Sequence, residues 1–270
     1  ESLGNFYDLQ WLTDVLRLVK GGKEASVYQC AADPQIAADF IAAKIYRPRM
    51  FRSLKNDYLY REGRANLDEA GLVILDHGMD HAMRVKSAYG LRLLHTSWIE
   101  HEFKTLELLH AAGADVPRPY TAGDNAILME YLGGEDTPAP SLSQLELERD
   151  EAQRLFERTV WNIDRMLAHE RIHGDLSAYN ILYWEGEIRL IDFPQAVSPR
   201  ENRNALGIFQ RDVRRTCEYF AAQGVRCNPR KLALELWTAH NHPLQPELDP
   251  RWLDEASPDD RRRWRKQTGG

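Results

Sequence analysis

The sequence predicts an α+β protein with two lobes, the first rich in strands and the second mostly helical. Residues 25–31 and 40–46 are short, largely apolar segments next to glycine or proline turns, which is typical of strands. From about residue 142 onward the apolar spacing becomes helical, most clearly over residues 155–169. Because strands and helices are grouped in this order, the pattern favours two regions of different class.

The first lobe is expected to open with an amphipathic helix over residues 6–19, where the apolar residues follow helical spacing. Gly21 and Gly22 interrupt that pattern. The two strands named above then form a hairpin, because Asp33-Pro34 supplies turn material between them.

Further along the first lobe, residues 72–75 and 83–85 are short apolar stretches that we interpret as strands. Residues 97–110 are apolar on one side and charged on the other, which predicts a helix that ends at Gly113. Residues 126–131 form the last predicted strand of this lobe.

The second lobe is expected to begin after Gly133-Gly134 and the proline-rich residues 137–140. It contains predicted helices over residues 206–224 and 229–240 and a hairpin over residues 181–191. The expected division is a first lobe of residues 1–132 with an insertion at about 47–96, a second lobe of residues 133–242, and a polar tail of residues 243–270.

Composition excludes several classes of protein. No apolar run approaches the roughly 20 residues that cross a bilayer, so no membrane association is expected. The net charge of −6 gives no overall attraction to nucleic acid. The spacing of Cys30, Cys217 and Cys227 argues against a zinc site or a disulfide framework, and residues 1–6 resemble no signal peptide. We therefore expect a cytoplasmic protein.

The strongest chemical signal is the string H-G-D-L-S-A-Y-N at residues 173–180, followed by I-D-F-P at residues 191–194. An H-x-D-x-x-x-x-N string with a second aspartate further on has the spacing of a kinase-like catalytic loop and metal-binding loop. Phosphoryl transfer requires an oriented nucleophile and a divalent metal. Asp175 is the candidate that accepts the proton of the nucleophile, and Asn180 and Asp192 offer the hard oxygen ligands that Mg²⁺ prefers.

Lys44 is the second candidate, because it lies in the middle of an apolar strand where an ammonium group needs an anionic partner. Only eight of the 35 basic residues are lysines, which makes this position more informative. ATP phosphates and a helix carboxylate would both satisfy it. Glu102 is the preferred carboxylate, and Glu100 is the alternative.

A glycine-containing loop at residues 21–28 precedes the strand that leads to Lys44. It is neither a Walker A loop nor G-x-G-x-x-G, so the loop taken alone fits an ordinary hairpin equally well. Its position suggests that backbone N–H groups and the hydroxyl of Ser26 meet phosphate oxygens.

Taken in order, several motifs resemble the RIO family of atypical protein kinases and ATPases. They are G-K-E-A-S-V-Y at 22–28, K-I-Y at 44–46, E-F at 102–103, V-P at 116–117, M-E-Y at 129–131, H-G-D-L-S-A-Y-N at 173–180, I-D-F-P-Q at 191–195 and R-D-V at 211–213. The resemblance runs from about residue 10 to residue 228.

The resemblance implies a reduced bilobal protein-kinase-like fold that binds ATP with Mg²⁺ or Mn²⁺ between the lobes. It implies that Asp175 is catalytic, that Asn180 and Asp192 bind the metal, and that Asp192 is also a candidate covalent phosphate acceptor. The ATP-binding residues implied in this sequence are Gly22, Lys23, Ser26, Val27, Lys44, Glu102, Met129, Glu130 and Leu132.

The sequence departs from the family pattern in one main respect. Lys44 and Glu102 are 58 residues apart, and the insertion between them, residues 47–96, is longer than the family's flexible loop. Its apolar runs predict partial structure. No winged-helix segment precedes the core in this sequence, so the subgroup with that domain is a poor match. The set of catalytic residues is complete, so an active enzyme is expected.

Three functions remain open at this point. The first is a serine/threonine protein kinase that phosphorylates itself or a protein substrate. The second is a nucleotide-gated ATPase that acts in an assembly such as a ribosomal particle. The third, a small-molecule kinase of the aminoglycoside-phosphotransferase type, fits the loop at residues 21–28 and Gln195 less well. Direct nucleic-acid binding is not indicated, although residues 47–64 form a basic patch.

Overall fold

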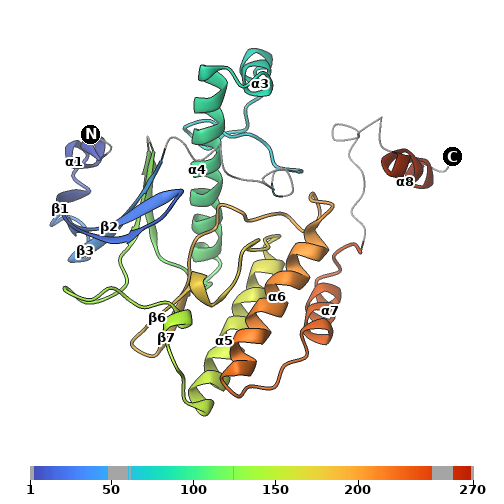
Figure 1. Cartoon of the computed structure of the whole chain (residues 1–270). Helices are drawn as coiled ribbons and strands as arrows, with labels where there is room; N and C mark the ends of the chain where they lie inside the picture. Colours follow the sequence, from blue (N-terminus) through green and yellow to red (C-terminus); the bar gives the residue numbers. More distant parts are fainter. Residues whose placement is uncertain (1–2, 48–59, 61, 124, 245–257, 269–270) are drawn as a thin grey trace. The chain divides into compact units, whose positions relative to one another are not determined.

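The computed structural model describes residues 3–47, 60, 62–123, 125–244 and 258–268, and Figure 1 traces its elements. The chain divides into two compact units. Unit 1 consists of residues 1–55, 65–147 and 178–194, and unit 2 consists of residues 56–64, 148–177 and 195–270. Unit 1 holds an antiparallel sheet and unit 2 is helical, which confirms the predicted α+β class. The lobe boundaries expected from the sequence stay a prediction.

The main sheet of unit 1 has five antiparallel strands in the order β1-β2-β3-β5-β4. Their bounds are β1 Leu12–Gly21, β2 Ala25–Ala32, β3 Phe40–Tyr46, β4 Pro119–Gly123 and β5 Ala126–Glu130. The expected hairpin is therefore confirmed as β2 and β3. Strand β4, which the sequence reading missed, begins with a proline at the edge of the sheet, where no ladder hydrogen bond is lost.

The two faces of the sheet bury different clusters, because side chains alternate along each strand. One face packs Ile41, Ala43 and Leu128 against Phe6 of the short helix α1, Gly4–Asp8. The opposite face packs Tyr46 and other apolar residues against the long helix α4, Ala88–Ala111. Residues 42, 44 and 46 of β3 thus point toward α4.

The predicted helix over residues 6–19 is wrong, because most of that segment is strand β1. Its apolar residues matched helical spacing, but Leu16 and Leu18 are exposed in the strand, at 46% and 55%. Because β1 carries apolar residues on its exposed face as well as on its buried face, its sequence does not show the two-residue alternation of a strand. Pairing with β2 along the whole length of β1 decides the conformation.

The predicted strand at residues 83–85 is also wrong, since helix α3 covers His77–Arg84 and buries Met83. Helix α4 begins at Ala88 rather than at residue 97, with the side chain of Ser87 accepting from the N–H of Gly90. Gly90 allows close packing, because a Cβ there would lie 1.9 Å from the Ala82 carbonyl oxygen.

Unit 1 ends with a small hairpin of β6, Ile181–Trp184, and β7, Glu187–Leu190, which confirms the hairpin expected over residues 181–191. Two short 3-10 turns accompany it, η2 at Leu142–Gln144 and η3 at Ala178–Asn180.

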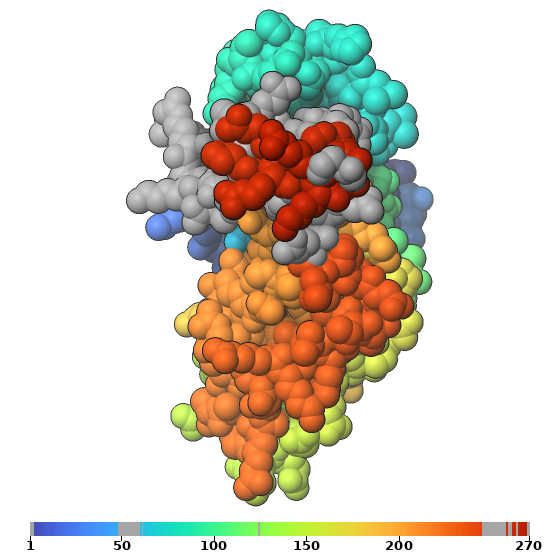
Figure 2. Space-filling model, turned by 90° about the vertical axis from the view of Figure 1, so that its right-hand side faces the viewer, coloured from blue at the N-terminus to red at the C-terminus, as the bar shows by residue number. Residues whose placement is uncertain are grey.

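Unit 2 contains three helices that pack on one another, α5 at Arg149–Ala168, α6 at Ala205–Ala222 and α7 at Pro229–Ala239 (Figure 1). These confirm the three helices expected in the second half. The rings of Phe209 on α6 and Trp237 on α7 lie 5.4 Å apart in the buried core. In Figure 2 the orange surface is formed by α6 and α7. A last helix, α8, covers Pro258–Thr268.

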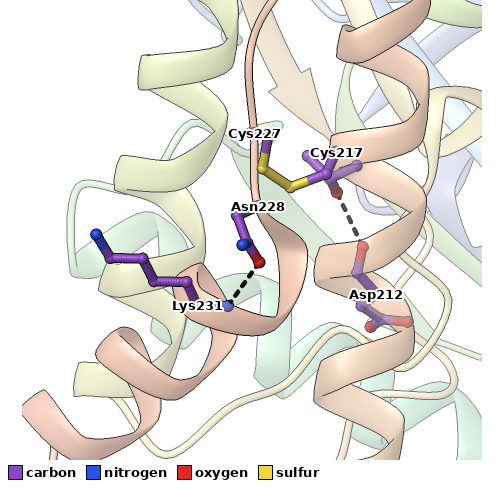
Figure 3. The surroundings of a disulfide bond; sticks show 6 residues. Asp212, Cys217, Cys227, Asn228 and Lys231 are labelled. Atoms are coloured by element: carbon purple, nitrogen blue, oxygen red, sulfur yellow. Dashed lines mark hydrogen bonds between the residues drawn. A yellow bond between two sulfur atoms is a disulfide. The ribbon is translucent and has the colours of Figure 1, made fainter.

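The expectation that the cysteines form no disulfide is wrong for one pair. Cys217 on α6 is bonded to Cys227 in the loop that leads to α7, with Cα atoms 5.6 Å apart (Figure 3). The chain turns back at the end of α6, where the N–H of Val225 donates to the carbonyl of Phe220. This turn brings two cysteines together that are 10 residues apart in sequence. Cys30 is a buried free thiol.

Among the described helices, none is long and apolar enough to span a bilayer. The basic patch expected at residues 47–64 lies largely outside the described residues.

Candidate active site

Strand β3 directs Lys44 toward the face of the sheet that α4 covers. Lys44 pairs in register with Val27 of β2 and with Ile127 of β5, so it lies in the middle of the sheet. Tyr46, two residues later on the same face, packs edge-on against Trp98 of α4 with ring centroids 5.0 Å apart. The packing leaves Lys44 only 8% exposed.

The buried ammonium of Lys44 has two carboxylate partners. Its Nζ donates to Oε1 of Glu102 at 2.6 Å and to Oδ1 of Asp192 at 2.5 Å. Burial would lower the pKa of Lys44, but the carboxylates of Asp192 and Glu102 outweigh burial and raise that pKa above its ordinary value. Lys44 is therefore a permanent positive charge between two acidic side chains.

Glu102 on α4 is the centre of a buried hydrogen-bond network. Besides Lys44, the hydroxyl of Tyr46 donates to its Oε2 at 2.5 Å, and the backbone N–H of Phe193 donates to its Oε1 at 3.3 Å. Glu102 is only 3% exposed, so these three donors compensate for the loss of water around the carboxylate. The network links β3, α4 and the segment that carries Asp192.

Glu100, the alternative partner of Lys44, lies two positions earlier on α4 and takes no part in this network. It is 6% exposed. Burial raises its pKa to about 7, and the charges of Glu107, Asp68 and Glu69 act in the same direction against the opposing effect of Lys104. The structure therefore pairs Lys44 with Glu102 and leaves Glu100 in a separate acidic environment.

The β6–β7 hairpin brings Asn180 close to the segment that contains Asp192. The backbone N–H of Ile191 donates to the carbonyl oxygen of Asn180 at 3.0 Å. Asp192 has φ 74°, a conformation that non-glycine residues rarely adopt and that is often found at functional sites. Its side chain is 43% exposed, so part of the carboxylate faces solvent while one oxygen contacts Lys44.

An amide and a carboxylate at one end of a hairpin fit the ligand chemistry of Mg²⁺ or Mn²⁺. Among the residues that the structure describes, no group of three His, Cys, Asp or Glu side chains could hold a metal by itself. A site with few protein ligands suits Mg²⁺, which commonly binds one or two carboxylates together with substrate phosphates and water.

The glycine-containing loop connects β1 to β2. The N–H of Gly22 donates to the carbonyl of Ala25 at 2.9 Å, which closes the turn. Lys23 is exposed. Ser26 is buried, and its Oγ accepts from the guanidinium of Arg47 at 3.3 Å. Val27 is the neighbour of Lys44 across the sheet.

The expected hinge follows the end of β5. Met129 and Glu130 pair with β3, and the carboxylate of Glu130 accepts from the backbone N–H of Arg118 at 3.0 Å. The carbonyl of Leu132 accepts from the N–H of Ala139 at 2.9 Å. These bonds fix the backbone on both sides of the segment.

Asp175 lies in unit 2, on a loop that helix α6 holds by its backbone. The N–H of Gly174 donates to Oδ2 of Asp212 at 2.8 Å, and the guanidinium of Arg211 donates to the carbonyl of Gly174. Burial raises the pKa of Asp212 against the opposing charges of His173 and Arg211. The carboxylate of Asp175 accepts from Nη1 of Arg215 at 2.7 Å.

Comparison with known proteins places these motifs in a family. The sequence model of the RIO domain matches residues 74–232, which is more than half of the chain. The chain belongs to the RIO family. The matched range of this RIO chain includes Glu102, Asp175, Asn180 and Asp192, whereas Lys44 and the loop at residues 21–28 precede it.

Three relatives extend the comparison. The chain is 32% identical over 208 residues to the RIO-type serine/threonine-protein kinase Rio1 of Haloferax volcanii, covering 76% of this chain and 63% of the relative. It is 24% identical to serine/threonine-protein kinase RIO1 of Caenorhabditis elegans and of Homo sapiens, covering 77% and 79% of this chain. The RIO chain spans only 37% and 34% of those two relatives.

The structure of this RIO chain thus groups the candidate residues in two places. Lys44, Glu102 and Asp192 contact one another in unit 1, where Asn180 lies close in the backbone ladder. Asp175 lies in unit 2 with its own partners.

Two residues that contact the candidate site residues were not expected from the sequence. Tyr46 binds the same carboxylate as Lys44, and its position two residues along the same strand was a usable signal. Arg215 contacts Asp175 from a helix 40 residues later, and no sequence pattern indicated it.

Proposed function

We propose that this RIO chain is an ATP-dependent phosphotransferase of the serine/threonine kinase type. In this proposal it transfers the terminal phosphoryl group of ATP to a hydroxyl of its own chain or of a protein substrate. The observation that carries the proposal is the buried Lys44, held between the carboxylates of Glu102 and Asp192. Family membership and the names of the kinase relatives agree with it.

Lys44 would bind the α- and β-phosphates of ATP, with Glu102 as the residue that orients it. Glu102 does more than compensate the charge of Lys44. It also accepts hydrogen bonds from the hydroxyl of Tyr46 and the backbone N–H of Phe193, which hold its carboxylate in place. The network fixes the ammonium in one place before nucleotide arrives, and such preorganisation favours electrostatic stabilisation of a phosphate. The loop at Gly22, Lys23, Ser26 and Val27 would contribute backbone N–H groups and a hydroxyl to the phosphates. Met129, Glu130 and Leu132 would contact the adenine as the hinge.

Asn180 and Asp192 would hold Mg²⁺ or Mn²⁺. The Asp192 side chain is 43% exposed, so a cation could reach its carboxylate beside the Lys44 contact. A metal held there would supply positive charge that offsets the negative charge developing during phosphoryl transfer. The chain would contribute the side-chain oxygens of Asn180 and Asp192, which flank the β6–β7 hairpin in sequence.

Asp175 would accept the proton of the attacking hydroxyl. As the new oxygen–phosphorus bond forms, the bond between the γ-phosphorus and the bridging oxygen breaks, ADP leaves, and the hydroxyl proton passes to the Asp175 carboxylate. Asn180 follows Asp175 by five positions, so the proposed base and metal ligand belong to one short segment of the sequence.

The test is turnover of γ-labelled ATP with Mg²⁺ by the wild type, Asp175→Ala and Asp192→Asn. The proposal expects labelled protein or labelled phosphate with the wild type and a loss of at least about 100-fold in both variants. Label that survives mild acid but is released by hydroxylamine would indicate an acyl-phosphate on Asp192, and hydroxylamine-resistant label would indicate a phosphoester. No turnover by the wild type would contradict the proposal.

A further inference from the structure

The catalytic loop at residues 173–180 contains no lysine or arginine. Phosphoryl transfer builds negative charge on the transferred group, and cationic side chains and metal ions stabilise that charge. If Asp175 works as proposed, a cationic side chain next to it has to come from outside its own loop.

Helix α6 supplies one. Nη1 of Arg215 donates to Oδ1 of Asp175 at 2.7 Å. The two side chains are 38% and 43% exposed, so both remain accessible to a substrate. Arginine carries five N–H donors and stays charged at every working pH. Within the part of the chain that the structure describes, Asp175 is the one hydrogen-bond partner of Arg215.

The same helix also fixes the backbone beside Asp175. Arg211 and Arg215 are four residues apart and therefore lie on one face of α6. Arg211 donates to the carbonyl of Gly174, and Arg215 binds the side chain of the next residue, Asp175. Asp212 accepts from the N–H of Gly174 at 2.8 Å. One helix thus controls both the main chain and the side chain at this point of the loop.

We propose that Arg215 is a positioning residue for phosphoryl transfer. It holds the Asp175 carboxylate in one orientation and places a positive charge next to it that the catalytic loop lacks. This inference rests on the proposed function, because it assigns Arg215 to the same reaction. It adds a residue that the sequence motifs did not identify.

The chain offers a close control. Arg214 is the neighbour of Arg215 on α6, but it points elsewhere and pairs with Glu218 at 3.6 Å, with both side chains more than half exposed. Arg214→Ala removes an arginine from the same helix without touching Asp175. Arg214→Ala and the test variant Arg215→Ala should both keep the fold, and melting curves check this.

The experiment measures kcat, KM for ATP and the dissociation constant of Mg-ADP for the wild type, Arg215→Ala, Arg215→Lys and Arg214→Ala. We expect Arg215→Ala to lose roughly 100-fold in kcat, with nucleotide affinity within about twofold of the wild type. Arg215→Lys should retain an intermediate rate, and millimolar guanidinium should restore part of the rate of Arg215→Ala. In an Asp175→Asn background, the further loss on Arg215→Ala should be less than about threefold, because the two residues act as a unit.

A kcat of Arg215→Ala within about threefold of the wild type would overturn the inference and leave the proposed function intact. An equal loss of kcat in Arg214→Ala would overturn the inference as well, because a general effect on α6 would then explain the result. So would a loss of kcat on Arg215→Ala that is as large in the Asp175→Asn background as in the wild type. A wild type without turnover would overturn both the inference and the proposed function.

Discussion

The Nζ atom of Lys44 lies 2.6 Å from Oε1 of Glu102, although the two residues are 58 positions apart. The insertion between them contributes α3 and the first turns of α4, and the Lys44–Glu102 pair forms between the sheet and α4. The ion pair forms across this long insertion because β3 and α4 pack against each other.

Removal of Glu102 is expected to destabilise the chain strongly. Glu102→Ala leaves the buried ammonium of Lys44, the hydroxyl of Tyr46 and the N–H of Phe193 without their common acceptor. Breaking a buried ion pair from one side costs about 3–5 kcal/mol. Urea denaturation measures this loss. The control is Glu107→Ala, whose exposed pair with Lys104 should contribute less than about 1 kcal/mol. Equal losses in both variants would contradict the buried network.

Tyr46→Phe isolates one bond of that network. The variant removes the hydroxyl that donates to Glu102 at 2.5 Å but keeps the ring against Trp98. The expected loss in unfolding free energy is about 1–2 kcal/mol, since a hydrogen bond to a charged group is stronger than an ordinary one. Tyr120→Phe on β4 is the control and should change the unfolding free energy by less than about 0.5 kcal/mol. A Tyr46→Phe variant as stable as the wild type would show that the hydroxyl does not bind the carboxylate.

Gly174→Ala is expected to abolish turnover and to reduce stability. Gly174 has φ 84°, and an added Cβ would lie 2.1 Å from the carbonyl oxygen of Gln195. Both effects distort the backbone next to Asp175. Gly207→Ala within α6 is the matched control, because an added Cβ there meets nothing within 4 Å. That substitution should be neutral or stabilising by up to about 1 kcal/mol. Full activity of Gly174→Ala would contradict the described loop.

Glu100 should make stability depend on pH near neutrality. Its folded-state pKa of about 7 is above the ordinary value of 4.5, chiefly because it is buried. Its contribution to folding is therefore complete below about pH 4.5 and is lost as the pH rises through about 7. Glu100→Gln cannot ionise at this position. The unfolding free energy of the variant minus that of the wild type should therefore be larger at pH 8 than at pH 5, by on the order of 2 kcal/mol.

Melting curves of the wild type, Glu100→Gln and the exposed control Glu146→Gln at both pH values test this expectation. A difference between wild type and Glu100→Gln that is the same at pH 5 and pH 8 would mean that Glu100 does not titrate in this range.

Local patterns in the sequence were sufficient where short-range information decides the structure. Short apolar segments beside turn residues identified β2 and β3, and the motifs identified Lys44 and Glu102, which the structure brings into contact. Long-range pairing decided the rest. Strand β1 forms because it pairs with β2, although its own apolar spacing is helical. The Cys217–Cys227 bond depends on a turn after α6, and the Arg215–Asp175 contact depends on helix packing. Neither leaves a periodic signal in the sequence.

The central claim is that the buried Lys44 cluster binds the phosphates of ATP. Titration calorimetry of Mg-ATP with the wild type, Lys44→Ala and Lys104→Ala tests it most directly, since Lys104 is a partly exposed lysine on α4 that pairs only weakly. We predict binding by the wild type and by Lys104→Ala with the same affinity, and an affinity at least about tenfold weaker for Lys44→Ala, because a charge-assisted phosphate contact contributes roughly 1.5–3 kcal/mol. Equal affinity of Lys44→Ala and the wild type, or no binding by any of the three, would contradict the claim.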